Sequence, residues 1–329
     1  MTKKKVKIGV AWSPDKSSFS YNAMLKSLEC LDAELVEIVE LGQAMLDCIE
    51  YENELRDAPS CLGCTDQRSI PFYHCKSYQL GDSNFLLNEA AERVKAAELN
   101  KSNIEKIMQN IDAVVLPGGI DICPSLYINP RRPFMVEEDY KPERDISDYA
   151  ILLYCIKHDI PTLAVCRGMQ MLSIICDGQL TQDIPSYLMK NNIKLSERYY
   201  HRQNKPYKDQ TDYITHDVVI RKYFPGTHDE TLAFKIFVVE RLNGVPSWHH
   251  HGLIESPNQH LKISGTNRVE HLILGEIAEV PECKFMLGLQ FHPEVAIFRN
   301  LEDPNKAQHY ISKEQSLLPF KALVQAANA

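Results

Sequence analysis

The sequence predicts an α/β protein with a doubly wound, mostly parallel central sheet that is flanked by helices and interrupted by insertions. The chain opens with a strand at residues 5–12, a helix at 21–28 and a second strand at 33–41. Two later runs, 111–116 and 161–165, are short, apolar and rich in β-branched residues, as buried parallel strands are. Strands that alternate with helices form parallel sheets, and the connecting helices cover both faces.

The segment after the second strand, residues 42–103, has the character of an insertion. It holds Cys61 and Cys64 with the two-residue gap that suits one zinc ion, and Cys75 is a third candidate ligand. A second close cysteine pair is missing, so free thiols in a loop are the favoured interpretation and a structural zinc is the alternative. Residues 85–99 have the apolar spacing of an amphipathic helix.

The strand at residues 111–116 runs into Pro117-Gly118-Gly119. Because neither glycine has a Cβ, the backbone N–H groups of this loop are open to a ligand. A plain tight turn is the alternative when the motif is taken alone. A helix at residues 146–158 follows and leads to the next strand.

The strand at residues 161–165 ends directly at Cys166, and an apolar helix begins near Gly168. Such a junction holds a cysteine on a sharp turn, beside the N–H groups and the positive end of the helix dipole, which favour a thiolate. This is the arrangement of a nucleophile elbow, with Cys in the place of Ser. A buried structural cysteine is the alternative, and the local sequence does not separate the two.

The last predicted strand, residues 286–290, ends at His292-Pro293-Glu294. Pro293 restricts the turn, so Glu294 can reach back to the imidazole and hold the proton of one ring nitrogen. The other nitrogen is then available to take the proton of Cys166. Since ligands bind at the carboxyl ends of parallel strands, the cysteine, the histidine and the glycine pair are expected at one site.

Three consecutive histidines, His249, His250 and His251, precede two further strands predicted at residues 261–266 and 271–277. Neighbouring residues of a strand face opposite sides of the sheet, so the three imidazoles are not expected to bind one ion. The segment also lacks the carboxylate at helical spacing that is typical of zinc peptidases. We therefore assign no metal to it.

Composition limits the remaining possibilities. The 329 residues suffice for one elaborated domain over residues 1–329, with residues 300–329 as a C-terminal tail that contains a helix near 321–327. A net charge of -8 argues against a nucleic-acid binder, and no run approaches the roughly 20 apolar residues of a membrane helix. Ten cysteines without a signal peptide indicate reduced thiols and a cytoplasmic protein, although export by a route without an N-terminal signal stays open.

Three separated motifs resemble one known family. They are Leu116-Pro117-Gly118-Gly119, Ala164-Val165-Cys166-Arg167-Gly168-Met169-Gln170 and Leu287-Gly288-Leu289-Gln290-Phe291-His292-Pro293-Glu294. In this order they are similar to the motifs of class I glutamine amidotransferase-like domains, and within that superfamily to the γ-glutamyl hydrolase group. The resemblance runs from Val6 to about Phe298, without most of the insertion, and implies a flavodoxin-like fold.

The resemblance implies a role for each residue of the three motifs. Cys166 corresponds to the nucleophile, His292 to the general base and acid, and Glu294 to the carboxylate that orients the imidazole. The backbone N–H of Arg167, together with that of Gly119 or Gly118, corresponds to the oxyanion hole. The Cys-Arg-Gly form is typical of the hydrolase group and favours a self-contained hydrolase.

The same resemblance points to substrate-binding positions. Gln170 matches a residue that helps to hold the glutamyl group, and His249 matches the end of an Asn-Ser-x-His segment that lines the pocket. Arg144 and His201 resemble positions near the substrate loop. The segment that ends at His249 departs from the family pattern, because it begins with Pro246 instead of asparagine.

The leading functional prediction is a cysteine hydrolase of γ-glutamyl amides that works through a thioester, without a cofactor or a metal. Its partner is a small γ-glutamyl compound or a glutamylated protein, with no nucleic acid or membrane involved, and a homodimer is expected. One alternative is a glutaminase subunit that delivers ammonia to a partner synthetase. The other is a non-catalytic binding module on the same fold.

Overall fold

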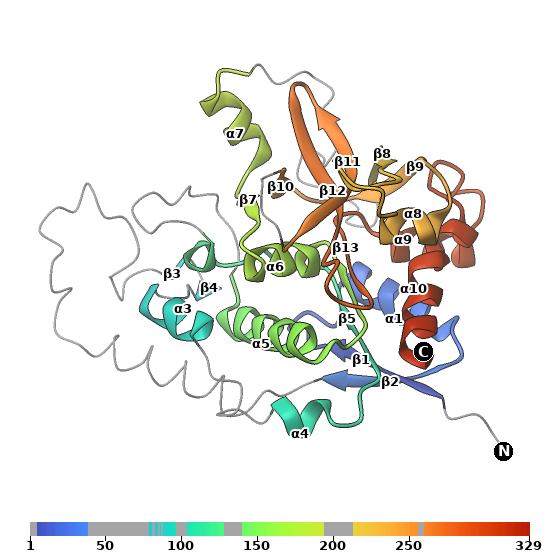
Figure 1. The fold of residues 1–329 in the computed structure, drawn as a ribbon, viewed down its shortest axis with the longest axis horizontal. Coiled ribbons are helices and arrows are strands. Elements are labelled where there is room, and N and C mark those ends of the chain that lie inside the picture. Colours follow the sequence, from blue (N-terminus) through green and yellow to red (C-terminus); the bar gives the residue numbers. More distant parts are fainter. Residues whose placement is uncertain are drawn as a thin grey trace, which may run out of the picture.

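The computed structural model describes residues 5–38, 79–80, 83–84, 86, 88–96, 104–127, 140–193, 213–255 and 260–329. The described strands form an 11-stranded sheet that carries helices on both faces, and a separate two-stranded ribbon, so the predicted α/β class is confirmed (Figure 1). The insertion cysteines Cys61, Cys64 and Cys75 lie outside the described residues, as does His201.

Five strands form the parallel half of the large sheet, in the order β2-β1-β5-β6-β13. They are β1 (Val6–Ala11), β2 (Ala33–Ile38), β5 (Ala113–Leu116), β6 (Thr162–Val165) and β13 (Met286–Leu289). All five fall within stretches that the sequence analysis predicts as strands. In β5, Val114 and Leu116 pack into one apolar core whereas Ala113 and Val115 pack into the other, so this strand is buried on both faces.

The other half of the sheet is antiparallel and continues from β13 through β12, β11, β8 and β9. These strands are β8 (Ile214–Ile220), β9 (Arg241–Ser247), β11 (Lys262–Val269) and β12 (Leu272–Glu279), with β10 (Gly252–Ile254) and β7 (Gln179–Thr181) beside β12. The link between β11 and β12 is too short for a crossover, and Glu270 within it has a positive φ. A connection of this length joins only antiparallel neighbours.

Helices cover both faces of the sheet, as a doubly wound fold requires (Figure 1). One face is covered by α3 (Asn88–Lys95), α4 (Ile104–Met108), α5 (Pro142–His158) and α6 (Arg167–Ile175). The other is covered by α1 (Phe19–Glu29), α8 (Leu232–Phe237), α9 (Pro293–Glu302) and α10 (Lys313–Asn328). The remaining elements are β3 (Gln79–Leu80), β4 (Ser83–Asn84), the 3₁₀ helix η2 (Pro124–Leu126) and α7 (Ile184–Lys190).

Helices α5 and α10 begin well before the residues at which the apolar spacing predicts them. Helix α5 starts at Pro142 because proline suits the first helical turn, where an N–H has no partner within the helix. Helix α10 starts at Lys313, where the Ser312 hydroxyl accepts a hydrogen bond from the Gln315 N–H, and it continues through Pro319. An internal proline normally ends a helix, which is why the sequence predicts only the part near residues 321–327.

Helix α10 belongs to the hydrophobic core, with Phe320 and Leu323 fully buried. Its contacts with β1, β5 and β6 tie the C-terminal segment to the parallel half of the sheet. None of the helices in the described ranges combines the length and the hydrophobicity that a membrane span requires.

Candidate active site

Cys166 occupies a strained turn between β6 and α6. Its backbone angles are φ 49° and ψ -105°, a conformation that costs free energy for any residue with a Cβ and that clusters at functional sites. Gly168 permits the sharp turn, because a Cβ there would lie 2.8 Å from both the Cβ and the carbonyl oxygen of Leu116. The Cys-x-Gly pattern thus has a geometric reason: only glycine lets α6 start this close to β5.

His292 lies just past the end of β13, at the residue directly before α9. Its Nδ1 is 2.6 Å from Oε1 of Glu294, both side chains are buried, and the ring lies on the Cys166 side of Gly118. Burial alone lowers the pKa of His292, but the charges of Glu294 and Cys166 outweigh it and raise the pKa to about 10. A protonated imidazole beside a cysteine sulfur favours a thiolate, the reactive form of cysteine.

Replacing Glu294 with glutamine is expected to lower the pKa of His292, because the carboxylate stabilises the imidazolium. The imidazolium then loses its proton at lower pH, so the alkaline limb of the kcat/KM profile moves to lower pH, and kcat/KM near neutrality falls about 10²-fold. The matched control is Glu302→Gln, which removes an exposed charge from the same helix. An alkaline limb that stays in place in Glu294→Gln would contradict the role of Glu294.

The loop Pro117-Gly118-Gly119, called the glycine loop from here on, packs against Cys166 and His292 at Gly118. A Cβ built on Gly118 would lie 2.7 Å from Cε1 of His292 and 3.4 Å from the Cβ of Cys166. Three strand ends that are far apart in sequence therefore meet at one point. The loop backbone, with its N–H groups, lies next to the candidate nucleophile and base, which is where the predicted oxyanion hole has to be.

Because the position of Gly118 has no room for a methyl group, Gly118→Ala is expected to displace the His292 ring. A displacement of about 1 Å lowers kcat about 10²-fold, since proton transfer depends steeply on geometry. Gly226→Ala is the control: a Cβ at Gly226 meets no atom within 4 Å, and its φ of 79° strains alanine, so this variant reports the effect of lost stability without displacing the ring. Equal turnover by the two variants in a steady-state assay would show that the loop does not constrain the ring.

Arg144 is buried beneath the glycine loop rather than free in the pocket. Its Nη2 donates to the carbonyl oxygens of Pro117 and Gly118, at 2.9 and 2.8 Å, and its Nη1 contacts the Ser13 hydroxyl at 3.4 Å. A Cβ on Gly119 would collide with the same guanidinium. The guanidinium also borders the pocket, so the predicted substrate contact stays a prediction, and the observed contacts make Arg144 a positioning residue for the loop.

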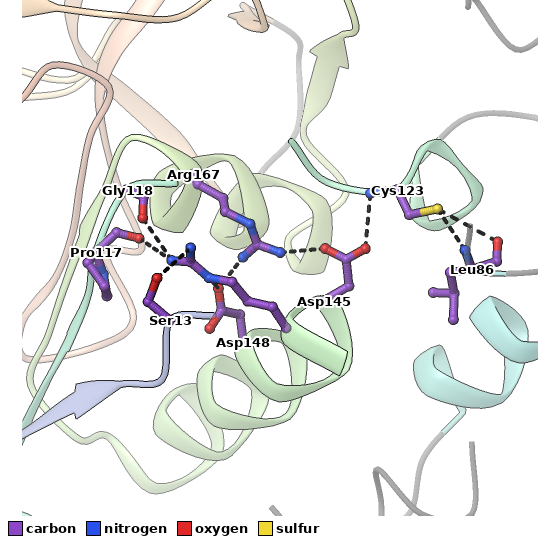
Figure 2. Close-up of polar contacts among 9 residues, drawn as sticks. Ser13, Leu86, Pro117, Gly118, Cys123, Asp145, Asp148 and Arg167 are labelled. Carbon is purple, nitrogen blue, oxygen red and sulfur yellow. Dashed lines mark hydrogen bonds and ion pairs between the residues drawn. The ribbon is translucent and has the colours of Figure 1, made fainter. Parts of the chain in front are cut away.

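Arg167 belongs to a buried cluster of charged side chains that lies beneath the site and includes Arg144 (Figure 2). Its guanidinium pairs with Asp145 and Asp148, and Asp148 also lies 3.5 Å from Nε of Arg144. Burial and the nearby Arg167 charge lower the pKa of Arg144 to about 10. Through Asp148, the cluster connects the glycine loop to the first residue of α6, the two elements predicted to provide the oxyanion hole.

A pocket of about 380 Å³ opens over Cys166 and His292, a volume typical of small-molecule sites. Gln170 and His249, predicted to bind substrate, both line it. Gln170 donates through Nε2 to Oε1 of Gln290 at 3.3 Å. A larger cavity of about 640 Å³, elsewhere on the described surface, contains none of the predicted site residues, so cavity size alone does not locate the site.

The sequence analysis missed two aromatic pocket residues. The Tyr213 ring packs edge-on against the His292 ring, with centroids 5.0 Å apart, and Trp248 packs against Tyr213 at 5.3 Å. Burial and the charge of Glu294 raise the pKa of Tyr213, so its hydroxyl stays neutral. Trp248 precedes the predicted His249, and this proximity was the one signal in the sequence. Tyr213 had none, because it follows a segment without a recognisable motif.

The three consecutive histidines lie in the loop between β9 and β10, not in a strand, and they divide between two clusters. His249 faces the buried pair His216 and Glu276, with Nε2 of His249 3.7 Å from Oε1 of Glu276 and Nε2 of His216 3.5 Å from Oε2. Burial lowers the pKa of His216 to about 4 and lowers that of His249, and it raises that of Glu276. His250 and His251 instead lie beside Asp121.

Comparisons with known proteins show which family the chain resembles. The family model for peptidase C26 matches residues 94–294. The chain is 29% identical over 207 residues to protein NtpR of Enterococcus hirae, covering 63% of this chain and 76% of that protein. It is 26% identical over 227 residues to the gamma-glutamyl-gamma-aminobutyrate hydrolase of Escherichia coli O157:H7, covering 66% of this chain and 80% of that one.

Two further similarities are to proteins described as glutamine amidotransferases. A putative one from Mycobacterium tuberculosis is 25% identical over 222 residues, which cover 68% of this chain and 58% of that protein. The crystal structure of one from Thermotoga maritima superposes with a TM-score of 0.49 at 11% identity, over 99% of this chain and 100% of that one.

Proposed function

Because the chain belongs to the peptidase C26 family and is a glutamine-amidotransferase-like hydrolase, we propose that it cleaves γ-glutamyl amide bonds with a cysteine nucleophile. One observation carries the proposal. A cysteine on a strained elbow, a histidine–glutamate pair and a glycine loop converge on a pocket of small-molecule size. These are the parts that acyl transfer by a thiolate needs.

The proposed reaction starts from the Cys166 thiolate beside the His292 imidazolium. The thiolate attacks the γ-carbonyl carbon, and the negative charge that develops on the oxygen is stabilised by N–H groups of the glycine loop and of Arg167. The imidazolium then gives its proton to the leaving amine, and a thioester to Cys166 remains. His292 next takes a proton from water, the hydroxide attacks the thioester, and glutamate leaves as the thiolate is regenerated.

The relative from Escherichia coli O157:H7, described as a gamma-glutamyl-gamma-aminobutyrate hydrolase, supports a γ-glutamyl amine as the substrate class. The pocket volume of about 380 Å³ also accommodates a small γ-glutamyl compound. The relatives described as glutamine amidotransferases favour a second candidate, a glutaminase that passes ammonia to a partner. Both candidates use the same thioester chemistry and differ in the leaving group.

A panel of amides tests the proposal and separates the candidates. Wild-type protein is assayed with γ-glutamyl-p-nitroanilide, γ-glutamyl-aminobutyrate, a short poly-γ-glutamate and glutamine, and α-glutamyl-p-nitroanilide is the matched control. We expect turnover of the γ-linked amines and none of the α-linked anilide. Preference for glutamine would favour the glutaminase, whereas the absence of turnover on every compound would contradict both.

A further inference from the structure

A second cluster of ionisable side chains lies on the wall of the same pocket, formed by Asp121, His250 and His251. Oδ2 of Asp121 is 3.2 Å from Nε2 of His250, and Oδ1 is 3.1 Å from Nδ1 of His251. One ligand atom from each of the three residues lies within 4.8 Å of the others. The two imidazoles are almost completely buried, and Asp121 is partly exposed to the pocket.

The outward-facing nitrogen of each imidazole has its own partner. Nδ1 of His250 is 3.3 Å from Oδ1 of Asp183, and Nε2 of His251 is 3.3 Å from the hydroxyl of Tyr127. Histidines that bind metals show this arrangement, in which a carboxylate or another polar group holds the far nitrogen and fixes the ring orientation. Asp183 is itself held in place, since it accepts a hydrogen bond from the N–H of Ser186 at the start of α7.

The distances suit a first-row transition metal. Ligand atoms about 2.0–2.2 Å from a tetrahedral zinc ion lie roughly 3.3 Å from one another, close to the 3.1 and 3.2 Å measured between Asp121 and the imidazoles. Two carboxylates, those of Asp121 and Asp183, face the two imidazoles. A set of two nitrogens and one oxygen suits zinc, cobalt or manganese better than calcium or magnesium.

We propose that Asp121, His250 and His251 form a binding site for one divalent transition-metal ion, with Zn²⁺ the best match, and that Asp183 and Tyr127 hold the two histidines in place. The other histidine cluster, His216 with His249 and Glu276, is less suited, because only His249 of that group borders the pocket. Three protein ligands leave at least one coordination position for a bound molecule. If the proposed hydrolase function holds, the glutamyl carboxylate is the group that would take that position.

The test measures metal binding directly and does not depend on enzyme activity. All variants carry Cys166→Ala, which removes the thiol of the pocket as a competing metal ligand. Chelator-treated full-length protein is titrated with Zn²⁺ by calorimetry, and bound zinc is counted by elemental analysis. Asp121→Asn and His251→Gln, each added to Cys166→Ala, are expected to lose one zinc per chain. His260→Gln, which replaces an exposed histidine near Glu282, is expected to lose none. The comparison between variants cancels any zinc bound by the insertion cysteines.

Two further measurements, Co²⁺ absorption and the Tm with Zn²⁺, test whether the metal binds at His251. Co²⁺ bound to Cys166→Ala should give weak visible d–d bands that disappear in His251→Gln, and Zn²⁺ should raise the Tm of the first variant but not of the second. Asp183→Asn should weaken zinc binding about 10–100-fold without removing the site. Unchanged zinc stoichiometry and affinity in both Asp121→Asn and His251→Gln would overturn the proposal, and would leave the cysteine chemistry untouched.

Discussion

Cys166→Ala is expected to lower the turnover of γ-glutamyl-p-nitroanilide by about 10⁴-fold or more, because no thioester can form without the thiol. The loss should fall on kcat, while KM changes little, because the pocket around Cys166 keeps its shape. A single-turnover experiment adds a second readout, since wild-type protein should accumulate a covalent γ-glutamyl adduct that mass spectrometry detects on Cys166 only.

Two controls separate chemistry from folding in this experiment. Cys30→Ala removes an exposed thiol at the end of α1 and should leave kcat unchanged. Cys166→Ala should unfold within a few degrees of wild type, since alanine fits the elbow and only one buried sulfur atom is lost. Turnover of the Cys166→Ala protein within tenfold of wild type would exclude the thioester mechanism.

Arg167→Met is expected to reduce the free energy of unfolding by about 3–5 kcal/mol, a large part of the stability of an ordinary domain. The guanidinium is buried between Asp145 and Asp148, and methionine leaves these two carboxylates with Arg144 as the remaining cation. An uncompensated charge in the interior costs far more than the original pair contributes. Urea unfolding followed by circular dichroism gives the free energy.

The matched control for Arg167→Met is Arg241→Met, which breaks a surface pair. Arg241 lies 2.7 Å from Asp217, with the two side chains 58% and 38% exposed, so the expected loss is below about 1 kcal/mol. Adding Asp145→Asn to Arg167→Met should recover part of the lost stability, because it removes one of the carboxylates left without a partner. Strictly additive losses in the double variant would show that the buried ions do not act as a unit.

Several features of the fold and site follow directly from local sequence patterns. All five strands of the parallel half fall within predicted stretches, and the elbow at Cys166 lies between the predicted strand and helix. His292 and Glu294 are two residues apart, so their contact is a local property of the turn at Pro293. Such features depend on the alternation of apolar and polar residues, on apolar runs and on turn residues, all of which are visible within a short segment of sequence.

Other features depend on contacts between distant parts of the chain. The substrate contact of Arg144 stays a prediction from family resemblance, and folding directs its guanidinium at the carbonyl oxygens of a loop 26 residues earlier. The pattern of three histidines argued against a shared ion, yet folding places His250 against Asp121, 129 residues away, and Asp183, 67 residues away. The spacing of residues near His250 in the sequence does not predict these two contacts.

The sequence by itself therefore determined the α/β class, the parallel strands and the three motifs that meet at the site. Only the tertiary structure decided how the strands of the antiparallel half pair, which buried charges hold the glycine loop, and which side chains lie together on the pocket wall. The physical reason is that strands, helices and turns are selected by neighbouring residues, whereas buried charges and imidazoles are positioned by whichever partners the packed core brings within hydrogen-bonding distance.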